Sequence, residues 1–236
     1  AITIVCLVLV PGILAANNWD DHDRSNKETA HSMAVAYLES CAPNAILFTI
    51  GDNDSFPLWY AQEIEGIRRD VRVVNTSLFQ TDWYIDQMKR KAYDSDPIPS
   101  QMTHDQYRYG TRDYIPYKGI SQDTLNIKDF MDFILSDNPR TKLKYVMQQE
   151  GDDPSVYPNQ MVNGNYFPTR FVKIPVNKEQ VLKNGIVKEK DADEIVDEIV
   201  IEIKGSALYK NRLLMLDIVA NNDWKRPIYF TGGSFG

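Results

Sequence analysis

The feature that most constrains the fold is a regular alternation of helical and strand patterns in the first part of the chain. Apolar residues recur at helical spacing or form short, continuous runs, as in buried helix faces and buried strands. The elements predicted in this way are helix 26–41, strand Ala45–Ile50, a helix directly after it, strand Val71–Asn75 and helix 82–92. Elements in this order, joined by short connections, are typical of a parallel sheet. We therefore predict an α/β fold of the Rossmann type, with a mostly parallel sheet and helices on both faces.

The pattern is less regular in the middle of the chain. Prolines, glycines and tyrosines accumulate over 93–170, which we interpret as an irregular, aromatic-rich insertion packed on the sheet. Further predicted elements are helix 127–136, strand 171–176, helix 178–184, strand 199–203, helix 207–221 and strand 227–231. We expect a single α/β domain over 17–236 that contains this insertion.

The first sixteen residues are uncharged and apolar. From composition alone this segment could be a buried helix or strand, or the end of a transmembrane helix cut short at residue 1. Left exposed, it would favour association with another copy of the chain. After it, Ser25 and Glu28 have the spacing of a capping box that would begin the first helix of the domain.

Composition excludes one class of function. The net charge is −7, whereas a general nucleic-acid-binding protein needs a basic face to neutralise phosphates. The two cysteines fall in apolar patterns and are interpreted as small hydrophobic residues.

Small and polar residues follow the predicted strands at the point where each strand ends. Because the carboxyl ends of parallel strands share one edge of a sheet, these residues should converge on one ligand-binding crevice. The candidate ligand-binding residues at the strand ends are Asp52, Asn53, Asp54, Asn75, Thr76, Ser77, Ser206, Gly232 and Gly233. A turn and helix cap would also explain the sequence after the first strand, except for Asp52, which neither needs.

Two other groups of residues are candidate sites. Asp20, Asp21, His22 and Asp23 could hold a divalent cation such as Mg²⁺ or Ca²⁺, or could simply be an acidic helix N-terminus. Trp59, Asp82 and Trp83 are further candidate ligand-binding residues, because aromatic rings can stack on sugars, although such residues are more often part of a core.

Three blocks of the sequence resemble a bacterial family of polytopic membrane proteins of unknown function. The matching blocks are NWDDHDRSNKETA, the stretch from Tyr37 to Met88, and LYKNRLLMLDIVANNDWKRPIYFTGG. This family is similar to the eukaryotic transmembrane protein O-mannosyltransferases, which have a GT-C-like membrane part followed by a soluble extracytoplasmic domain. The resemblance implies that residues 1–16 end a membrane-spanning helix and that the rest lies on the periplasmic side.

The resemblance also implies a role. Members of this class are expected to transfer a sugar from a polyprenyl-phosphate carrier, using a catalytic acid in an early loop that this chain lacks, so no catalytic residue carries over. We expect the domain to bind a glycan or protein acceptor. The alternatives are a metal-assisted hydrolase, in which Asp20, His22, Asp52 and Asp54 surround one cation, and a non-catalytic scaffold.

Overall fold

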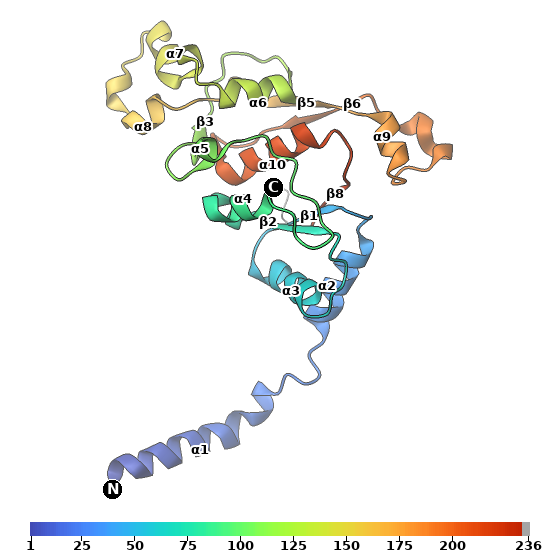
Figure 1. Ribbon diagram of the computed structural model, residues 1–236. Coiled ribbons are helices and arrows are strands. Elements are labelled where there is room, and N and C mark those ends of the chain that lie inside the picture. Colours follow the sequence, from blue (N-terminus) through green and yellow to red (C-terminus); the bar gives the residue numbers. More distant parts are fainter. Residues whose placement is uncertain (233–236) are drawn as a thin grey trace.

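The computed structural model describes residues 1–232 and is a mixed α/β structure. Its centre is a three-stranded parallel sheet in the order β2-β1-β8 (Figure 1). Strand β1 (Ile46–Thr49) pairs in parallel with β2 (Arg72–Asn75) on one side and with β8 (Ile228–Phe230) on the other. The prediction that the first two strands run in the same direction is confirmed.

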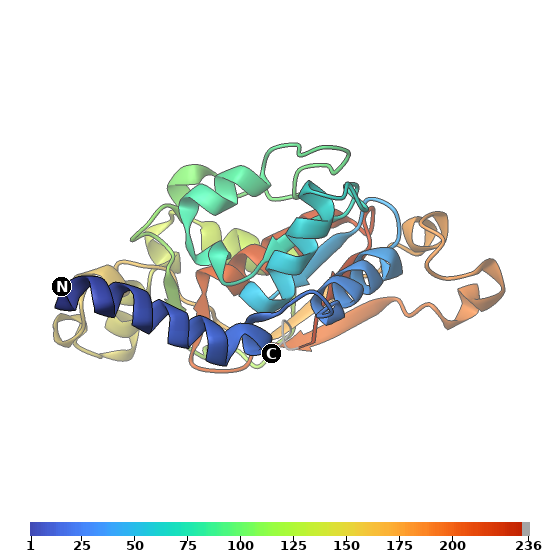
Figure 2. The same ribbon diagram turned by 90° about the horizontal axis from the view of Figure 1, so that it is seen from below.

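Helices cover both faces of this sheet. Helices α2 (Thr29–Ser40) and α3 (Asp52–Glu63) pack side by side below it, and Figure 2 shows them from that side. Helices α4 (Asp82–Met88) and α10 (Lys210–Asn222) lie above it. Neighbouring residues of β1 point to opposite faces of the sheet. Leu47 packs with α2 and α3 on one face, while Phe48 packs with α4 and α10 on the other. This two-sided burial explains why the strands read as continuous apolar runs.

The other strands form two separate small sheets, so one large, mostly parallel sheet is not present in the described residues. Strands β4 (Leu125–Asn126), β5 (Phe171–Pro175) and β6 (Glu198–Glu202) form one sheet, in which β6 runs antiparallel to β5. Strands β3 (Tyr114–Pro116) and β7 (Ala207–Tyr209) form an antiparallel pair. The alternating pattern over 199–203 is typical of a half-exposed antiparallel strand, and it should have indicated a different sheet from the continuous runs.

Two predicted helix starts are wrong for identifiable reasons, and the helix expected over 82–92 ends earlier, at Met88. The helix expected over 207–221 begins only at Lys210, because Ala207 and Leu208 pair with β3 as strand β7. The expected capping box is also absent. The Ser25 amide donates to Asp23 Oδ1 (2.9 Å) in an Asx turn, and α2 begins at Thr29 without a side-chain cap.

The segment 93–170 contains more helix than its composition suggests. It holds α5 (His104–Tyr107), α6 (Ile127–Leu135), α7 (Leu143–Glu150) and α8 (Asn159–Val162), and α9 (Lys178–Lys183) follows it. Tyr107, Phe130 and Phe167 are buried in the main core together with α10. Residues of α7 and α8 form a smaller apolar cluster around Tyr166. Part of the aromatic residues of the segment is therefore used for packing, whereas others, such as Tyr109 and Tyr157, are exposed.

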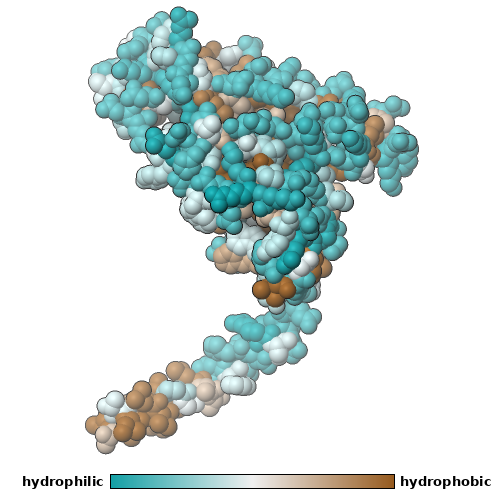
Figure 3. Space-filling view, in the orientation of Figure 1, coloured by the Kyte–Doolittle hydropathy of each residue, from teal (hydrophilic) through white to brown (hydrophobic). Residues whose placement is uncertain are grey.

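Helix α1 (Ile2–His22) extends away from the domain and has no buried residue. Figure 3 shows that its far half is mostly apolar and that its end nearer the domain is polar. Within residues 1–232 it alone is long and apolar enough to cross a membrane, and it runs six residues beyond the sixteen-residue apolar segment. The acidic cluster that follows this segment is thus largely the end of α1 and not, as considered above, a helix N-terminus.

Candidate functional site: the rim of the parallel sheet and an aromatic cavity beside β2

The carboxyl ends of β1, β2 and β8 meet at one rim, where Asp54 joins two of them. Its Oδ2 accepts hydrogen bonds from the amide of Ile50 (2.9 Å) and from Thr231 Oγ1 (2.6 Å), and its Oδ1 accepts one from the amide of Gly51 (2.9 Å). Burial raises the pKa of Asp54, but the bonds from Thr231, Ile50 and Gly51 outweigh it and hold the pKa below its usual value. The carboxylate therefore links the residues that directly follow β1 to Thr231, which directly follows β8.

A second network joins β2 to the same rim. Asn75 Nδ2 donates to Ser55 Oγ (2.9 Å), which lies 2.5 Å from Thr49 Oγ1, and Asn75 Oδ1 accepts from the amide of Leu78 (3.0 Å). Thr76 Oγ1 donates to the carbonyl of Thr49 (2.8 Å). These side chains are buried, so their polar groups serve to hold the rim together.

Three more of the predicted rim residues, Ser77, Asp52 and Asn53, are exposed and do not belong to the buried networks. Ser77 Oγ donates to the carbonyl of Ile50, whereas Asp52 and Asn53 are exposed in the first turn of α3. Asp52, the residue that a turn alone did not require, thus faces solvent beside the rim.

The remaining rim candidates are only partly brought together. Gly232 directly follows the rim residue Thr231, and Gly233 lies outside the described residues. Ser206 does not belong to this rim, because it follows β6 of the separate sheet and precedes β7. Its backbone carbonyl accepts from the amide of Tyr117.

The acidic residues 20–23 lie outside the domain. Asp20, Asp21 and His22 end α1, where His22 Nδ1 lies 2.8 Å from the carbonyl of Asn18, and all are exposed. Figure 1 shows this segment well apart from the carboxyl ends of the central strands. Within residues 1–232, no three His, Cys, Asp or Glu side chains are grouped as a metal site would require. The arrangement gives no support to a shared cation between the two acidic motifs.

The two predicted tryptophans do come together. Trp59 from α3 and Trp83 from α4 line one cavity of about 350 Å³ beside β2, one of the two edge strands of the parallel sheet. Trp83 is 56% exposed, and its ring makes a T-shaped contact with the ring of Tyr84. Asp82 is the first residue of α4, and its Oδ1 accepts from the amide of Trp83 (2.9 Å) without lining the cavity.

Polar side chains share this cavity with the two rings. Glu63, Arg69, Gln87 and Tyr93 are among its lining residues. The Arg69 guanidinium lies 4.3 Å from the ring centre of Tyr93, and the Tyr93 hydroxyl donates to Glu63. That hydrogen bond, followed by burial and by the negative charge of Glu63, raises the pKa of Tyr93. The cavity thus offers aromatic faces, hydrogen-bond donors and hydrogen-bond acceptors within one small space.

The backbone of Tyr93 is unusual. Its φ is +52°, in the left-handed region that a bulky residue rarely adopts. Such strain persists only where the surrounding structure enforces it, and it is concentrated at functional sites. Sequence patterns did not single out Tyr93, whereas Glu63 and Arg69 both lie within the second block that carries the family resemblance.

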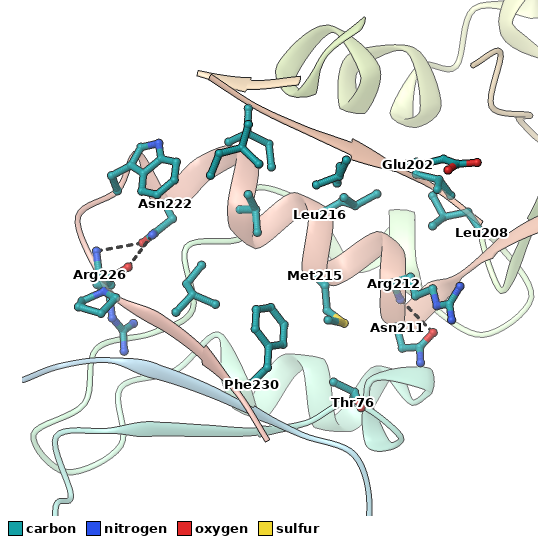
Figure 4. A pocket seen from close by; sticks show the side chains of 18 of the residues that line it. Thr76, Glu202, Leu208, Asn211, Arg212, Met215, Leu216, Asn222, Arg226 and Phe230 are labelled. Carbon is teal, nitrogen blue, oxygen red and sulfur yellow. Dashed lines mark hydrogen bonds between the residues drawn. The ribbon is translucent and has the colours of Figure 1, made fainter. Parts of the chain in front are cut away.

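A larger cavity of about 1020 Å³ runs along α10 between the two three-stranded sheets. We call it the α10 groove. Figure 4 shows Thr76, Asn211 and Glu202 near one end, Met215, Leu216 and Phe230 along its length, and Asn222 with Arg226 at the other end. Burial lowers the pKa of Arg226 to about 10. The rim of the parallel sheet therefore opens into a mostly apolar channel.

Comparison with known proteins gives one match. The family model described as TMEM260-associated domain 2 matches residues 30–236. No curated protein and no solved structure matches the chain. The family match covers everything after the first residue of α2, including both cavities and the rim. The chain therefore belongs to the TMEM260-associated domain 2 family.

Proposed function

We propose that this chain is the sugar-binding domain of a membrane glycosyltransferase-like protein, and that the ligand binds in the cavity lined by Trp59 and Trp83. The observation that carries the proposal is that two tryptophans from different helices share one cavity with Glu63, Arg69 and Gln87. The apolar face of a pyranose ring stacks on an aromatic ring, while its hydroxyls need donors and acceptors around the edge. The cavity volume of about 350 Å³ is within the range of small-molecule sites.

The family and α1 support the wider setting. TMEM260 is an O-mannosyltransferase-like membrane protein of eukaryotes, and α1 could attach this domain to a membrane. We propose that the parent is a bacterial GT-C-like protein that transfers a sugar from a polyprenyl-phosphate carrier. In that protein the domain stands on the periplasmic face and presents the glycan or protein acceptor. The sugar transfer itself is assigned to no residue of this chain.

The test uses the full-length polypeptide that carries this chain in the cell. Trp83→Ala removes one stacking face, and because Trp83 is more than half exposed the fold should tolerate the change. Mass spectrometry of exported proteins should then show lower occupancy of O-linked hexose. Trp83→Phe, which retains an aromatic face, should restore most of it. Unchanged occupancy and acceptor range in a folded Trp83→Ala protein would contradict the proposal.

A second candidate function is the binding of an acceptor polypeptide in the α10 groove. It is favoured by β6, an edge strand of its sheet, whose residues Ile199 and Ile201 line the groove. An extended peptide can add to such an edge and place alternate side chains in an apolar channel. Ile199→Asp should abolish capture of peptides from a displayed random library, whereas Val200→Asp, also exposed but not lining the groove, should have no effect. Equal capture by both variants would exclude this function.

A further inference from the structure

Helix α3 exposes a line of large apolar side chains. Phe56 and Tyr60 lie within the helix, and Ile64 is the residue that caps its C-terminal end. Because the three residues are four positions apart, they lie on one face of the helix. Their exposed fractions are 52%, 53% and 70%. We call this line the α3 face. Single exposed apolar residues are common, but an aligned set on one helix indicates an interaction surface.

The α3 face lies on the side of the domain that α1 approaches. His31 Nε2, near the start of α2, lies 2.8 Å from Glu65 Oε2, just after the end of α3. The start of α2 and the Ile64 end of the α3 face are therefore neighbours. Figure 3 shows strongly apolar surface at this lower end of the domain, above the connection to α1.

The connection from α1 to α2 is short. It consists of residues 23–28, which can span at most about 20 Å when fully extended. Trp19 precedes it in the polar end of α1 and is 79% exposed, and tryptophan is enriched at the level of lipid headgroups. If α1 spans a bilayer, the start of α2 is held close to the membrane surface.

We propose that the α3 face rests on the bilayer interface, so that the domain lies against the membrane and does not hang freely from α1. Tyrosine and phenylalanine are suited to this interface, since their rings are apolar and the tyrosine hydroxyl can remain in contact with water or headgroups. Tethering by α1 keeps the face at a high effective concentration near the lipid, so a few partly exposed side chains are sufficient. This proposal does not depend on sugar binding, because it concerns residues outside the lining of the aromatic cavity.

The experiment is lipid-specific fluorescence quenching with the complete chain in vesicles of phosphatidylcholine and phosphatidylglycerol. A bimane label is attached at Tyr60→Cys or, as a matched control, at Tyr109→Cys in a background carrying Cys6→Ala and Cys41→Ala. Tyr109 is 86% exposed and follows α5 in the chain, and α5 lies on the opposite side of the parallel sheet from α3. The quencher is a phospholipid with a nitroxide on an early carbon of its acyl chain.

The label at residue 60 should lose most of its fluorescence, because the apolar face of an interfacial helix sits about 5–10 Å into the headgroup and acyl boundary. The label at residue 109 should lose little. Quenching of both labels by aqueous iodide, with no extra quenching by the nitroxide lipid at residue 60, would overturn the proposal. Protection of residue 60 from both quenchers would overturn it as well, since it would show that a second copy of the chain covers the α3 face.

Discussion

Replacing Asp54 tests the structural role of the rim most sharply. Asp54→Ala removes the acceptor of the Thr231 hydroxyl and of the backbone amides of Ile50 and Gly51, which directly precede α3. A hydrogen bond to a charged group contributes about 2 kcal/mol, and loss of a helix cap costs about 1 kcal/mol. The expected loss in the free energy of unfolding is therefore about 3 kcal/mol at pH 7.

Asp52→Ala is the matched control, because Asp52 lies in the same turn and is exposed. Its only expected stabilising contribution is to the helix dipole, about 0.5 kcal/mol. The assay is urea unfolding of the full chain in detergent micelles, followed by far-UV circular dichroism, with similar slopes in denaturant for both variants. A loss below 1 kcal/mol for Asp54→Ala, or equal losses for the two variants, would refute the reasoning.

The pH dependence of the same difference gives an independent check. The folded-state pKa of Asp54 is lowered, so its carboxylate stabilises the fold fully above the unfolded pKa of about 4. That contribution is lost as the pH falls through the lower folded-state pKa. The gap between the native chain and Asp54→Ala should therefore narrow in acid, and a gap that widened there would contradict the assignment.

The remaining predictions concern buried charge and backbone strain. Lys210 is fully buried and paired with Asp113. Asp113→Ala leaves this buried charge without its partner and should destabilise the fold by about 3 kcal/mol or more, whereas Lys210→Met removes the charge and should cost much less. The reverse order of the two losses in urea unfolding would contradict this. Burial raises the pKa of Asp217 despite its bond from Ser100, so native stability should fall as the pH rises from about 4 to that raised pKa. Asp217→Asn should remove this decline in stability. If the decline persisted in the variant, it would have to come from another titratable group. At Tyr93, glycine should be more stable than alanine by about 1 kcal/mol in thermal unfolding, because only alanine retains the cost of positive φ; the opposite order would show that the turn is not strained.

The parallel core could be predicted because each of its signals is local. Ala45–Ile50 and Val71–Asn75 are uninterrupted apolar runs, and burial on both faces is what makes them so. The convergence of Asp54, Asn75 and Thr76 at one rim followed from the direction of these strands alone. Their use in holding the rim could not be predicted, since hydrogen-bond partners such as Thr231 and Ser55 become neighbours only in the folded chain.

The other sheets and the aromatic cavity depend on contacts that are distant in sequence. Strand β7 exists because Ala207–Tyr209 pairs with a strand more than ninety residues earlier, and the local pattern there favoured a helix. Trp59 and Trp83 could be named as aromatic candidates. That they face one cavity, together with Tyr93 in a strained turn, depends on how α3 and α4 flank the edge of β2.

The central claim is that the cavity between α3 and α4 binds a sugar, and the four tryptophans of the chain allow a direct measurement. Trp59 and Trp83 line this cavity, Trp224 lines the α10 groove, and Trp19 belongs to α1. The indole N–H signals of the ¹⁵N-labelled chain in micelles would be followed during titration with mannose and mannose oligosaccharides. The account predicts saturable shifts for Trp59 and Trp83 while Trp19 and Trp224 stay in place. No shift at Trp59 and Trp83, or a shift confined to Trp224, would contradict it.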